Sequence, residues 1–223
     1  MQRIHYHFGV VLGLILFSLG FQLAAGESDW ARLATVILQA ATLVAAVIAS
    51  RVPPRVIRLA TVTAILAILG AVAAILGTDR FGDDSGRVVT LLLLALVPPA
   101  IVTGLLKLNR ERGGVTVQTM FGVLCLYLLI GMFFGTAYAA IEEVGGRAFF
   151  QQLPASAAST NDFLYFSFTT ITTVGYGDLT AATNLGRSLA IMEALLGQIY
   201  LVTVVAVIIG NLRPARSSSS RAR

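Results

Sequence analysis

The sequence predicts an all-α membrane protein with six transmembrane helices and, between the fifth and the sixth, a short re-entrant helix followed by an extended loop. The first observation is composition: 57% of the 223 residues are hydrophobic and only 12% are charged, whereas soluble domains carry about 25% charged residues. The second is a set of six long apolar runs, and the third is an apolar segment between the last two. This composition excludes an ordinary soluble protein and a disordered one.

Each of the six apolar runs is long enough to cross a bilayer, which takes about 20 mostly apolar residues. Five carry no charge, and the sixth is interrupted only by Glu193. The expected spans are residues 8–25, 33–50, 59–78, 88–106, 115–141 and 188–212. The first run also fits a secretory signal peptide that ends at Ala24-Ala25-Gly26. Its length exceeds the usual apolar core of such a signal, so we expect it to be retained as a helix.

The charged residues sort by side of the membrane. If the N-terminus lies inside, the cytoplasmic segments hold eleven of the 16 Lys and Arg residues against a single acid, Glu111. The opposite side then holds five arginines and nine of the 11 acids. Because cytoplasmic loops of membrane proteins are enriched in Lys and Arg, both termini are expected in the cytoplasm. The net charge of +5 is thus a sign of orientation, and the sequence indicates no nucleic-acid partner.

The apolar segment before the sixth span covers residues 161–172 and follows a polar, turret-like stretch at 142–158. Ser159 and its neighbours supply capping groups, and Asp162 places an acid in the first turn, which favours a helix start here. Twelve residues make roughly 18 Å of helix, about half of a membrane thickness. We therefore expect a re-entrant helix that enters the membrane from outside.

The loop after this helix offers a row of backbone carbonyl groups. At membrane depth, irregular backbone persists only where it is buried in protein or lines water, so these carbonyls must face a group that satisfies them. Gly175 and Gly177 permit backbone angles that aim successive carbonyls the same way. Such a row replaces the hydration shell of a cation, and the C-terminal end of the preceding helix adds negative potential.

The stretch Thr172-Thr173-Val174-Gly175-Tyr176-Gly177-Asp178 resembles the potassium-channel signature, in which backbone carbonyl oxygens take the place of the water around the ion. The resemblance extends over residues 115–212, an outer helix, pore helix, filter and inner helix. It implies that dehydrated K⁺ is the permeant ion and that no cofactor is needed. It also implies a homotetramer, because each chain contributes one loop to a ring of four. The implied ion-binding residues are Thr173 (carbonyl and hydroxyl), Val174, Gly175, Tyr176 and Gly177.

Six spans with the pore last resemble the six-span voltage-gated-like superfamily, in a prokaryotic form. A voltage sensor needs several arginines in the fourth span, because each charge that crosses the field contributes about 2.3 kcal/mol per 100 mV. Residues 88–106 contain none, so weak or absent voltage sensing is expected. The expected domains are a four-helix N-terminal bundle at 1–106, a linker at 107–114, a pore domain at 115–212 and a basic cytoplasmic tail at 213–223.

Glu193 is the only charge inside an expected span and is therefore a candidate functional residue. In the first hypothesis its carboxylate accepts hydrogen bonds from pore-helix hydroxyls such as Thr169 or Thr170 and supports the filter from behind. In the second it faces a water-filled cavity and attracts cations. Gly197, four residues later, shares its helix face. Because glycine allows close helix approach, we favour the first hypothesis.

Further residues receive roles from the resemblance. Asp178 would bond to the pore helix behind the filter, with Tyr165 at a position where the family often has a tryptophan partner; the alternative is a solvated acid at the pore mouth. Gly197 would be the gating hinge, or else a packing glycine. The candidates for lining the cavity, by spacing only, are Gln198, Leu201, Val202 and Val205.

Two other functions remain open: a less selective cation channel, and a non-conducting membrane scaffold or lipid-sensing module. No Walker loop, His-Glu-x-x-His motif or nucleophile–base arrangement is present in the sequence, so we do not expect an enzyme. The one cysteine excludes an intrachain disulfide. Membrane lipids are expected contacts, no soluble partner is evident, and the expected location is the plasma membrane of a prokaryote.

Overall fold

The computed structural model describes residues 7–25, 28–50, 52–75, 83–112 and 116–211. Within these ranges it is all-helical, with no strand and one isolated pair of bridging residues, Phe150 and Ala181. The helices are α1 (Phe8–Ala24), α2 (Asp29–Ala49), α3 (Pro54–Ile75), α4 (Asp83–Arg112), α5 (Val117–Gly145), α6 (Thr160–Ile171) and α7 (Asn184–Asn211). The predicted all-helical fold class is confirmed over this part of the chain. The expected tail at 213–223 lies outside the described residues, as do residues 76–78 of the third expected span.

Among the described residues, four helical stretches are long and apolar enough to cross a membrane by length and composition: Pro54–Val72, Leu91–Leu108, Val117–Gly145 and Asn184–Val207. The helices at Phe8–Ala24 and Leu33–Ala49 are also apolar but shorter. All six expected spans thus contain an apolar helix, and four of these helices are long enough to cross a membrane. Four apolar helices of this length support an integral membrane protein.

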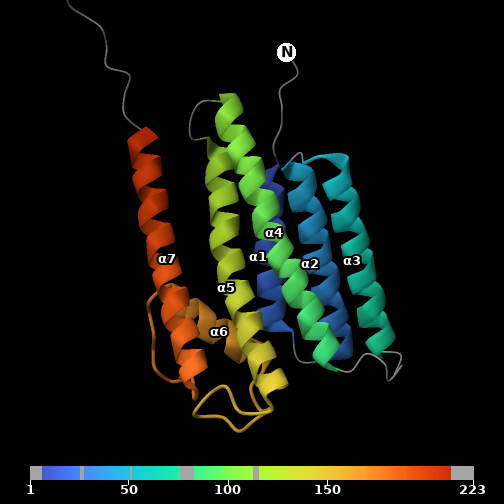
Figure 1. Ribbon diagram of the computed structural model, residues 1–223, viewed down its shortest axis with the longest axis vertical. Helices are drawn as coiled ribbons and strands as arrows, with labels where there is room; N and C mark the ends of the chain where they lie inside the picture. Colours follow the sequence, from blue (N-terminus) through green and yellow to red (C-terminus); the bar gives the residue numbers. More distant parts are fainter. Residues whose placement is uncertain (1–6, 26–27, 51, 76–82, 113–115, 212–223) are drawn as a thin grey trace, which may run out of the picture.

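The helices form two groups (Figure 1). Helices α1 to α4 lie side by side as a bundle, and α5 packs against α1 and α4 of the same chain. The short α6 lies between α5 and α7 and contacts both. The first residue of α1 and the last of α7 lie at the same end of the molecule. This geometry places the loop after α6 at the other end of α7.

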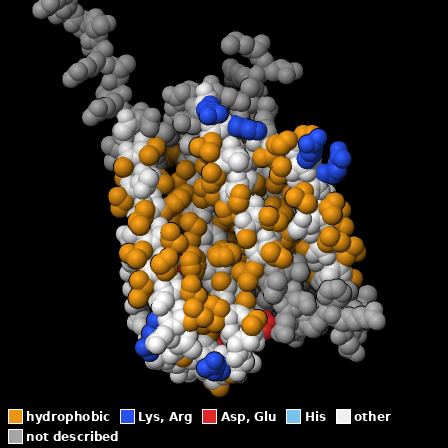
Figure 2. Space-filling model, viewed as in Figure 1, with side chains coloured by type: hydrophobic (Ala, Val, Ile, Leu, Met, Phe, Trp, Pro, Cys, Tyr) orange, Lys and Arg blue, Asp and Glu red, His pale blue; other side chains and the backbone are white. Residues whose placement is uncertain are grey.

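The surface has a hydrophobic middle and charged ends (Figure 2). Hydrophobic side chains cover most of the visible face, and Lys and Arg side chains lie near its two ends. Arg55 and Arg58 lie at the start of α3, and Lys107 and Arg110 lie near the end of α4, all at the end of the molecule where α7 finishes. A protein surrounded by lipid shows this pattern, because charges avoid the hydrocarbon core.

Helices extend beyond the apolar runs that predicted them. Helix α4 continues through residues 107–112, which were expected to be a linker, and α5 continues four residues past Ile141 to Gly145. Helix α7 begins at Asn184, before the apolar run at 188. The physical reason is that loss of hydrophobicity marks the edge of the bilayer, whereas a helix ends where its backbone conformation changes. Helix α5 is followed by Gly146 in the left-handed conformation, with φ of 58°.

The stretch at 142–158, which the sequence suggested to be a polar turret, is exposed at most of its residues but also contains buried aromatic side chains. Phe149 and Phe150 are buried there and pack with Tyr138, Phe163 and Phe166 in an aromatic cluster. The rings meet edge-on or tilted, with the centroids of Phe149 and Phe163 5.9 Å apart and those of Phe150 and Phe163 5.1 Å apart. These two aromatic residues are buried because the loop that carries them folds back over the start of α6.

Glu142 holds this loop in place, and its replacement tests the arrangement. Its buried carboxylate accepts hydrogen bonds from the Phe149 N–H at 2.7 Å and the Ser156 N–H at 2.9 Å. We expect Glu142→Ala to lower the free energy of unfolding, because each orphaned buried N–H costs about 1–3 kcal/mol. Thermal unfolding in detergent measures this, with Val144→Ala on the exposed surface as the control. Equal unfolding midpoints for the two variants would contradict the prediction.

Candidate functional site

The short helix α6 begins at a reciprocal cap. The Asp162 N–H donates to the Ser159 hydroxyl at 3.2 Å, and the Ser159 N–H donates to the Asp162 carboxylate at 2.8 Å. This capping box satisfies backbone donors that have no partner within the helix. The helix covers Thr160–Ile171, one residue from the predicted range, and directs its C-terminus at the loop that follows.

In that loop, left-handed residues alternate with others. Thr173, Gly175 and Gly177 have φ of 59°, 49° and 80°, whereas Val174 and Tyr176 between them do not have positive φ. Alternation of this kind turns successive peptide groups the same way, with the N–H groups on one side and the carbonyls on the other. Thr173 is an outlier because a β-branched residue avoids positive φ. Such strain costs about 1–3 kcal/mol and is concentrated at functional sites.

The N–H side of the loop faces α6. The N–H of Thr173 donates to the Thr170 carbonyl at 2.9 Å, and those of Val174 and Gly175 donate to the Thr169 carbonyl at 2.9 and 3.1 Å. These acceptors belong to the last turn of the helix, where carbonyls have no partner within the helix. In a trans peptide the carbonyl of one residue points opposite to the N–H of the next, so the carbonyls of residues 172–174 face away from α6. Residues 172–178 are all exposed in the single chain. The described part of this chain therefore leaves the carbonyl side of the loop open.

Side chains brace the loop at both ends. At its C-terminal end, the Tyr165 hydroxyl donates to the Asp178 carboxylate at 2.8 Å, and the Tyr165 ring stacks on Tyr176 with centroids 6.3 Å apart. The structure thus brings together the expected pair of Tyr165 and Asp178. At the other end of the loop, the Gln198 side-chain amide donates a hydrogen bond to the Thr173 hydroxyl at 3.4 Å. Gln198 was expected only as a cavity residue.

Glu193 is fully buried and connects three helices. Its carboxylate accepts from the Tyr138 hydroxyl of α5 at 2.7 Å and from the Ser167 hydroxyl of α6. Ser167 also lies 2.7 Å from the Gly131 carbonyl of α5. This cluster joins α6 to α5 and α7 through hydrogen bonds.

The partners of Glu193 differ from the expected ones. Thr169 and Thr170 were the expected donors, but the Thr169 hydroxyl donates to the Phe166 carbonyl within its own helix at 3.0 Å. The reason is the rotation of α6 about its axis, which turns Ser167 towards α5 and α7. Sequence reasoning missed Ser167 and Tyr138. A signal for Tyr138 was available, because a tyrosine inside a membrane span needs a hydrogen-bond partner.

The remaining candidates lie along α7. Gly197 is buried against α6, and the cavity-lining candidates Gln198, Leu201, Val202 and Val205 are exposed in the single chain. Tyr127 is a further residue that the sequence did not indicate, and its hydroxyl donates to the Ile171 carbonyl at 3.3 Å. The end of α6 is therefore held by side chains from both long helices.

Gly197 permits the close approach of α7 to α6. A Cβ atom at this position would lie 2.6 Å from the Ile171 carbonyl oxygen, so we expect Gly197→Ala to separate the two helices. The gain in helix propensity of roughly 1 kcal/mol is outweighed by overpacking, which costs about 1–3 kcal/mol. In the matched control Gly210→Ala, also in α7, the added Cβ meets nothing within 4 Å. Thermal unfolding compares the two, and a Gly197→Ala variant as stable as Gly210→Ala would refute the clash.

Comparison with known proteins supports an ion channel domain in the second half of the chain. Residues 122–213, which run from within α5 past the end of α7, match a family model described as an ion channel. The match covers less than half of the chain and supports an ion channel domain in this segment. With the apolar helices, it indicates an integral membrane protein that is a channel and not an enzyme.

Two curated relatives add detail. The chain is 29% identical over 119 residues to the voltage-gated potassium channel regulatory subunit KCNF1 of Rattus norvegicus. This alignment covers 49% of this chain and 23% of that protein. It is 39% identical over 84 residues to Protein LctB of Bacillus caldotenax, and this alignment covers 35% of this chain and 61% of that protein. The chain thus spans about a quarter of the first relative and three fifths of the second. No solved structure matches it significantly.

Proposed function

We propose that this protein is a potassium-selective channel in which Thr173, Val174, Gly175 and Tyr176 coordinate dehydrated K⁺ through their carbonyls. The observation that carries the proposal is the alternation of left-handed φ at residues 173, 175 and 177. Together with three N–H groups bonded to the end of α6, it leaves a row of carbonyls for an ion. The Thr173 hydroxyl adds one more oxygen, and Gly177 completes the loop. The similarity to a potassium channel subunit supports the same ion.

The proposed assembly is a homotetramer. One chain supplies a single row of carbonyls, and a cation needs oxygens on all sides, as four such loops around an axis provide. The exposed face of α7 supports an interface, because Leu195, Ile199 and Val202 are 54%, 63% and 67% exposed. One relative is called a regulatory subunit, which favours a second possibility, assembly with a different channel chain. Light scattering of the purified chain distinguishes a tetramer of one chain from a form that needs a partner.

The proposed topology has six spans, with α6 as a re-entrant pore helix and both termini in the cytoplasm of a prokaryotic cell. The position of Arg55, Arg58, Lys107 and Arg110 at the end of the molecule where α7 finishes supports this orientation. In this arrangement α1 to α4 form the N-terminal bundle, α5 to α7 form the pore domain, and the carbonyl loop opens outside. Gly197 serves as a packing or hinge position on the inner helix α7, and Leu201 and Val205 line the cavity below the filter.

Flux from the purified chain in liposomes tests the function. We expect K⁺ efflux down a gradient, block by Ba²⁺, and a reversal potential in mixed K⁺ and Na⁺ that follows the K⁺ gradient. A reversal potential that ignores the ion type would instead support a less selective cation channel. Absence of flux from a folded tetramer would support a non-conducting scaffold or a regulatory subunit.

Voltage dependence is expected to be weak. Span residues 91–106 of α4 contain no basic side chain, so the bundle moves little charge through the field, at about 2.3 kcal/mol per charge per 100 mV. Recordings from planar bilayers at both polarities measure this, and open probability should vary little with voltage. A steep activation curve would contradict the prediction and would call for sensor charges elsewhere in the chain.

A further inference from the structure

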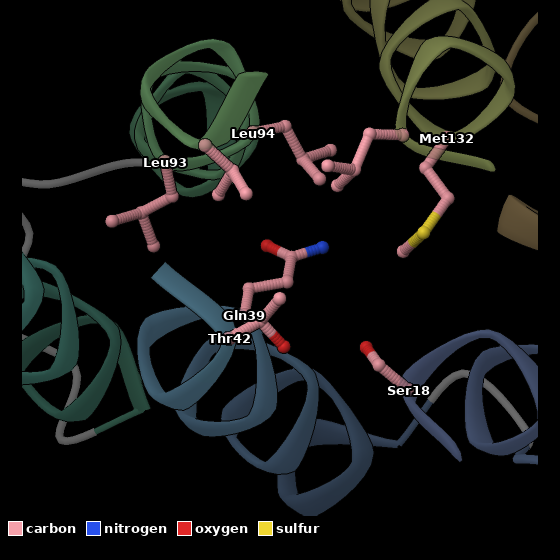
Figure 3. A pocket seen from close by; sticks show the side chains of 8 residues that line it. Ser18, Gln39, Thr42, Leu93, Leu94 and Met132 are labelled. Carbon is pink, nitrogen blue, oxygen red and sulfur yellow. The ribbon is translucent and has the colours of Figure 1, made fainter. Parts of the chain in front are cut away.

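A small cavity lies where the N-terminal bundle meets α5 (Figure 3). It is lined by eight buried side chains from α1, α2, α4 and α5. One wall is apolar and includes Leu93 of α4 and Met132 of α5, whereas the other carries three polar side chains. These are Ser18 of α1 and Gln39 and Thr42 of α2.

Gln39 is the unusual member of this set. Its side chain is 3% exposed, and neither its amide nitrogen nor its amide oxygen has a hydrogen-bond partner among the described residues. Figure 3 shows the amide group in the middle of the cavity, between the helices. A buried amide without partners is strongly unfavourable, and such groups in native proteins are almost always satisfied by protein or by ordered water.

The space beside the amide matches one water molecule. The centre of a water-sized sphere can occupy about 10 Å³ of the cavity, close to the smallest volume that holds an ordered water. A lipid chain or an organic ligand would need far more room. Space and chemistry therefore both favour water.

The two hydroxyls complete the polar wall. The Thr42 hydroxyl donates to the Leu38 carbonyl at 2.8 Å, so its oxygen is available to accept from a water. The Ser18 hydroxyl accepts from the Gln22 amide at 3.2 Å, and in Figure 3 it points into the cavity. With both polar atoms of Gln39, the site offers the two to four polar partners that an internal water requires.

We propose that Ser18, Gln39 and Thr42 form an internal water site between the N-terminal bundle and α5. The water accepts a hydrogen bond from the Gln39 amide and donates to the Thr42 hydroxyl, and Ser18 supplies a third contact. It fills a gap between α2 and the apolar residues of α4 and α5, and so forms part of the contact between the bundle and the pore domain. The proposal does not depend on conduction of K⁺.

Solid-state NMR of the full chain in lipid bilayers tests the site. The glutamine side chains are labelled with ¹⁵N, and the signal of the Gln39 amide is assigned by its absence from the spectrum of Gln39→Leu. Magnetisation transferred from water protons should then reach the Gln39 amide. In Thr42→Val, which keeps the shape of the side chain, the transfer should fall about twofold or more, because an internal water usually makes about three hydrogen bonds and loses one here. Ser18→Ala gives an independent version of the same comparison.

Two results would overturn the proposal. Absence of transfer to Gln39 in the unaltered protein would show a dry cavity. Transfer that is unchanged in both Thr42→Val and Ser18→Ala would show a water held without these hydroxyls, which is a different site. The unaltered protein alone decides whether water is present, so poor folding of a variant does not remove the test. Thermal unfolding of Gln39→Leu adds a second measurement: its midpoint should not fall, because an apolar side chain of similar length needs no water.

Discussion

Replacement of Gly175 by alanine is expected to abolish K⁺ flux while leaving the protein folded. Gly175 has φ of 49°, and a left-handed backbone costs an L-residue with a Cβ about 1–2 kcal/mol. In a ring of four chains, the summed cost of holding four alanine residues in the conducting backbone conformation is roughly 4–8 kcal/mol. Flux should therefore fall by far more than tenfold, since a factor of ten corresponds to about 1.4 kcal/mol.

The matched control is Gly145→Ala at the end of α5. A Cβ atom added at Gly145 or at Gly175 meets nothing within 4 Å in the single chain, but only Gly175 has positive φ. The comparison thus separates backbone strain from added bulk. Potassium efflux from liposomes is the measurement, with light scattering to verify assembly. Equal flux from the two variants would mean that the carbonyl row at residues 173–176 does not carry the ion.

Replacement of Glu193 is expected to have the second largest effect. Glu193→Ala removes an acceptor for the hydroxyls of Tyr138 and Ser167. Ser167 keeps the Gly131 carbonyl as an acceptor, but the buried Tyr138 hydroxyl is left unsatisfied, which costs about 1–3 kcal/mol. Helix α6 then loses its hydrogen bond to α7 at Ser167, and the carbonyl loop loses part of its support. We expect a lower unfolding midpoint and a large loss of K⁺ flux. Glu193→Gln keeps an acceptor of the same shape and should retain most of both.

The effect of K⁺ on the unfolding midpoint distinguishes a role of Glu193 at the filter from a general contribution to stability. An ion that binds only the folded state raises the unfolding midpoint, so the unaltered protein should unfold at a higher temperature in K⁺ than in Na⁺. In Glu193→Ala this difference should shrink. If the difference persisted while overall stability fell, Glu193 would be a structural residue only. If Glu193→Gln kept the difference but lost conductance, the cavity-facing hypothesis would replace the supporting role.

The site shows which features sequence patterns predict well. The bounds of α6 were predicted to within one residue, because its cap at Ser159 and its length are local properties. Glu193 stood out because charge is rare within a span. Its partners Tyr138 and Ser167 could not be predicted, because they come from two other helices whose rotation depends on packing. For the same reason, the burial of Phe149 and Phe150 was missed.

Some predictions await experiment. The assignment of K⁺ to residues 173–177, the homotetramer and the position of the termini rest on the proposed function. The structure contributes geometry to these proposals: the alternating φ values and the contact between Tyr165 and Asp178. The flux and unfolding experiments on Gly175 and Glu193 test the assignment of the ion, and light scattering tests the homotetramer.

The sequence by itself determined that this is a helical membrane protein, where its apolar helices lie, and which loop is the candidate ion site. Run length, charge distribution and glycine spacing are properties of neighbouring residues, and the bilayer acts on them directly. Only the tertiary structure decided that Glu193 bonds to Tyr138 and Ser167, that Gly197 packs against Ile171, and that Gln39 faces a cavity. Those contacts join helices far apart in the chain, and their geometry follows from how the helices rotate and pack against one another.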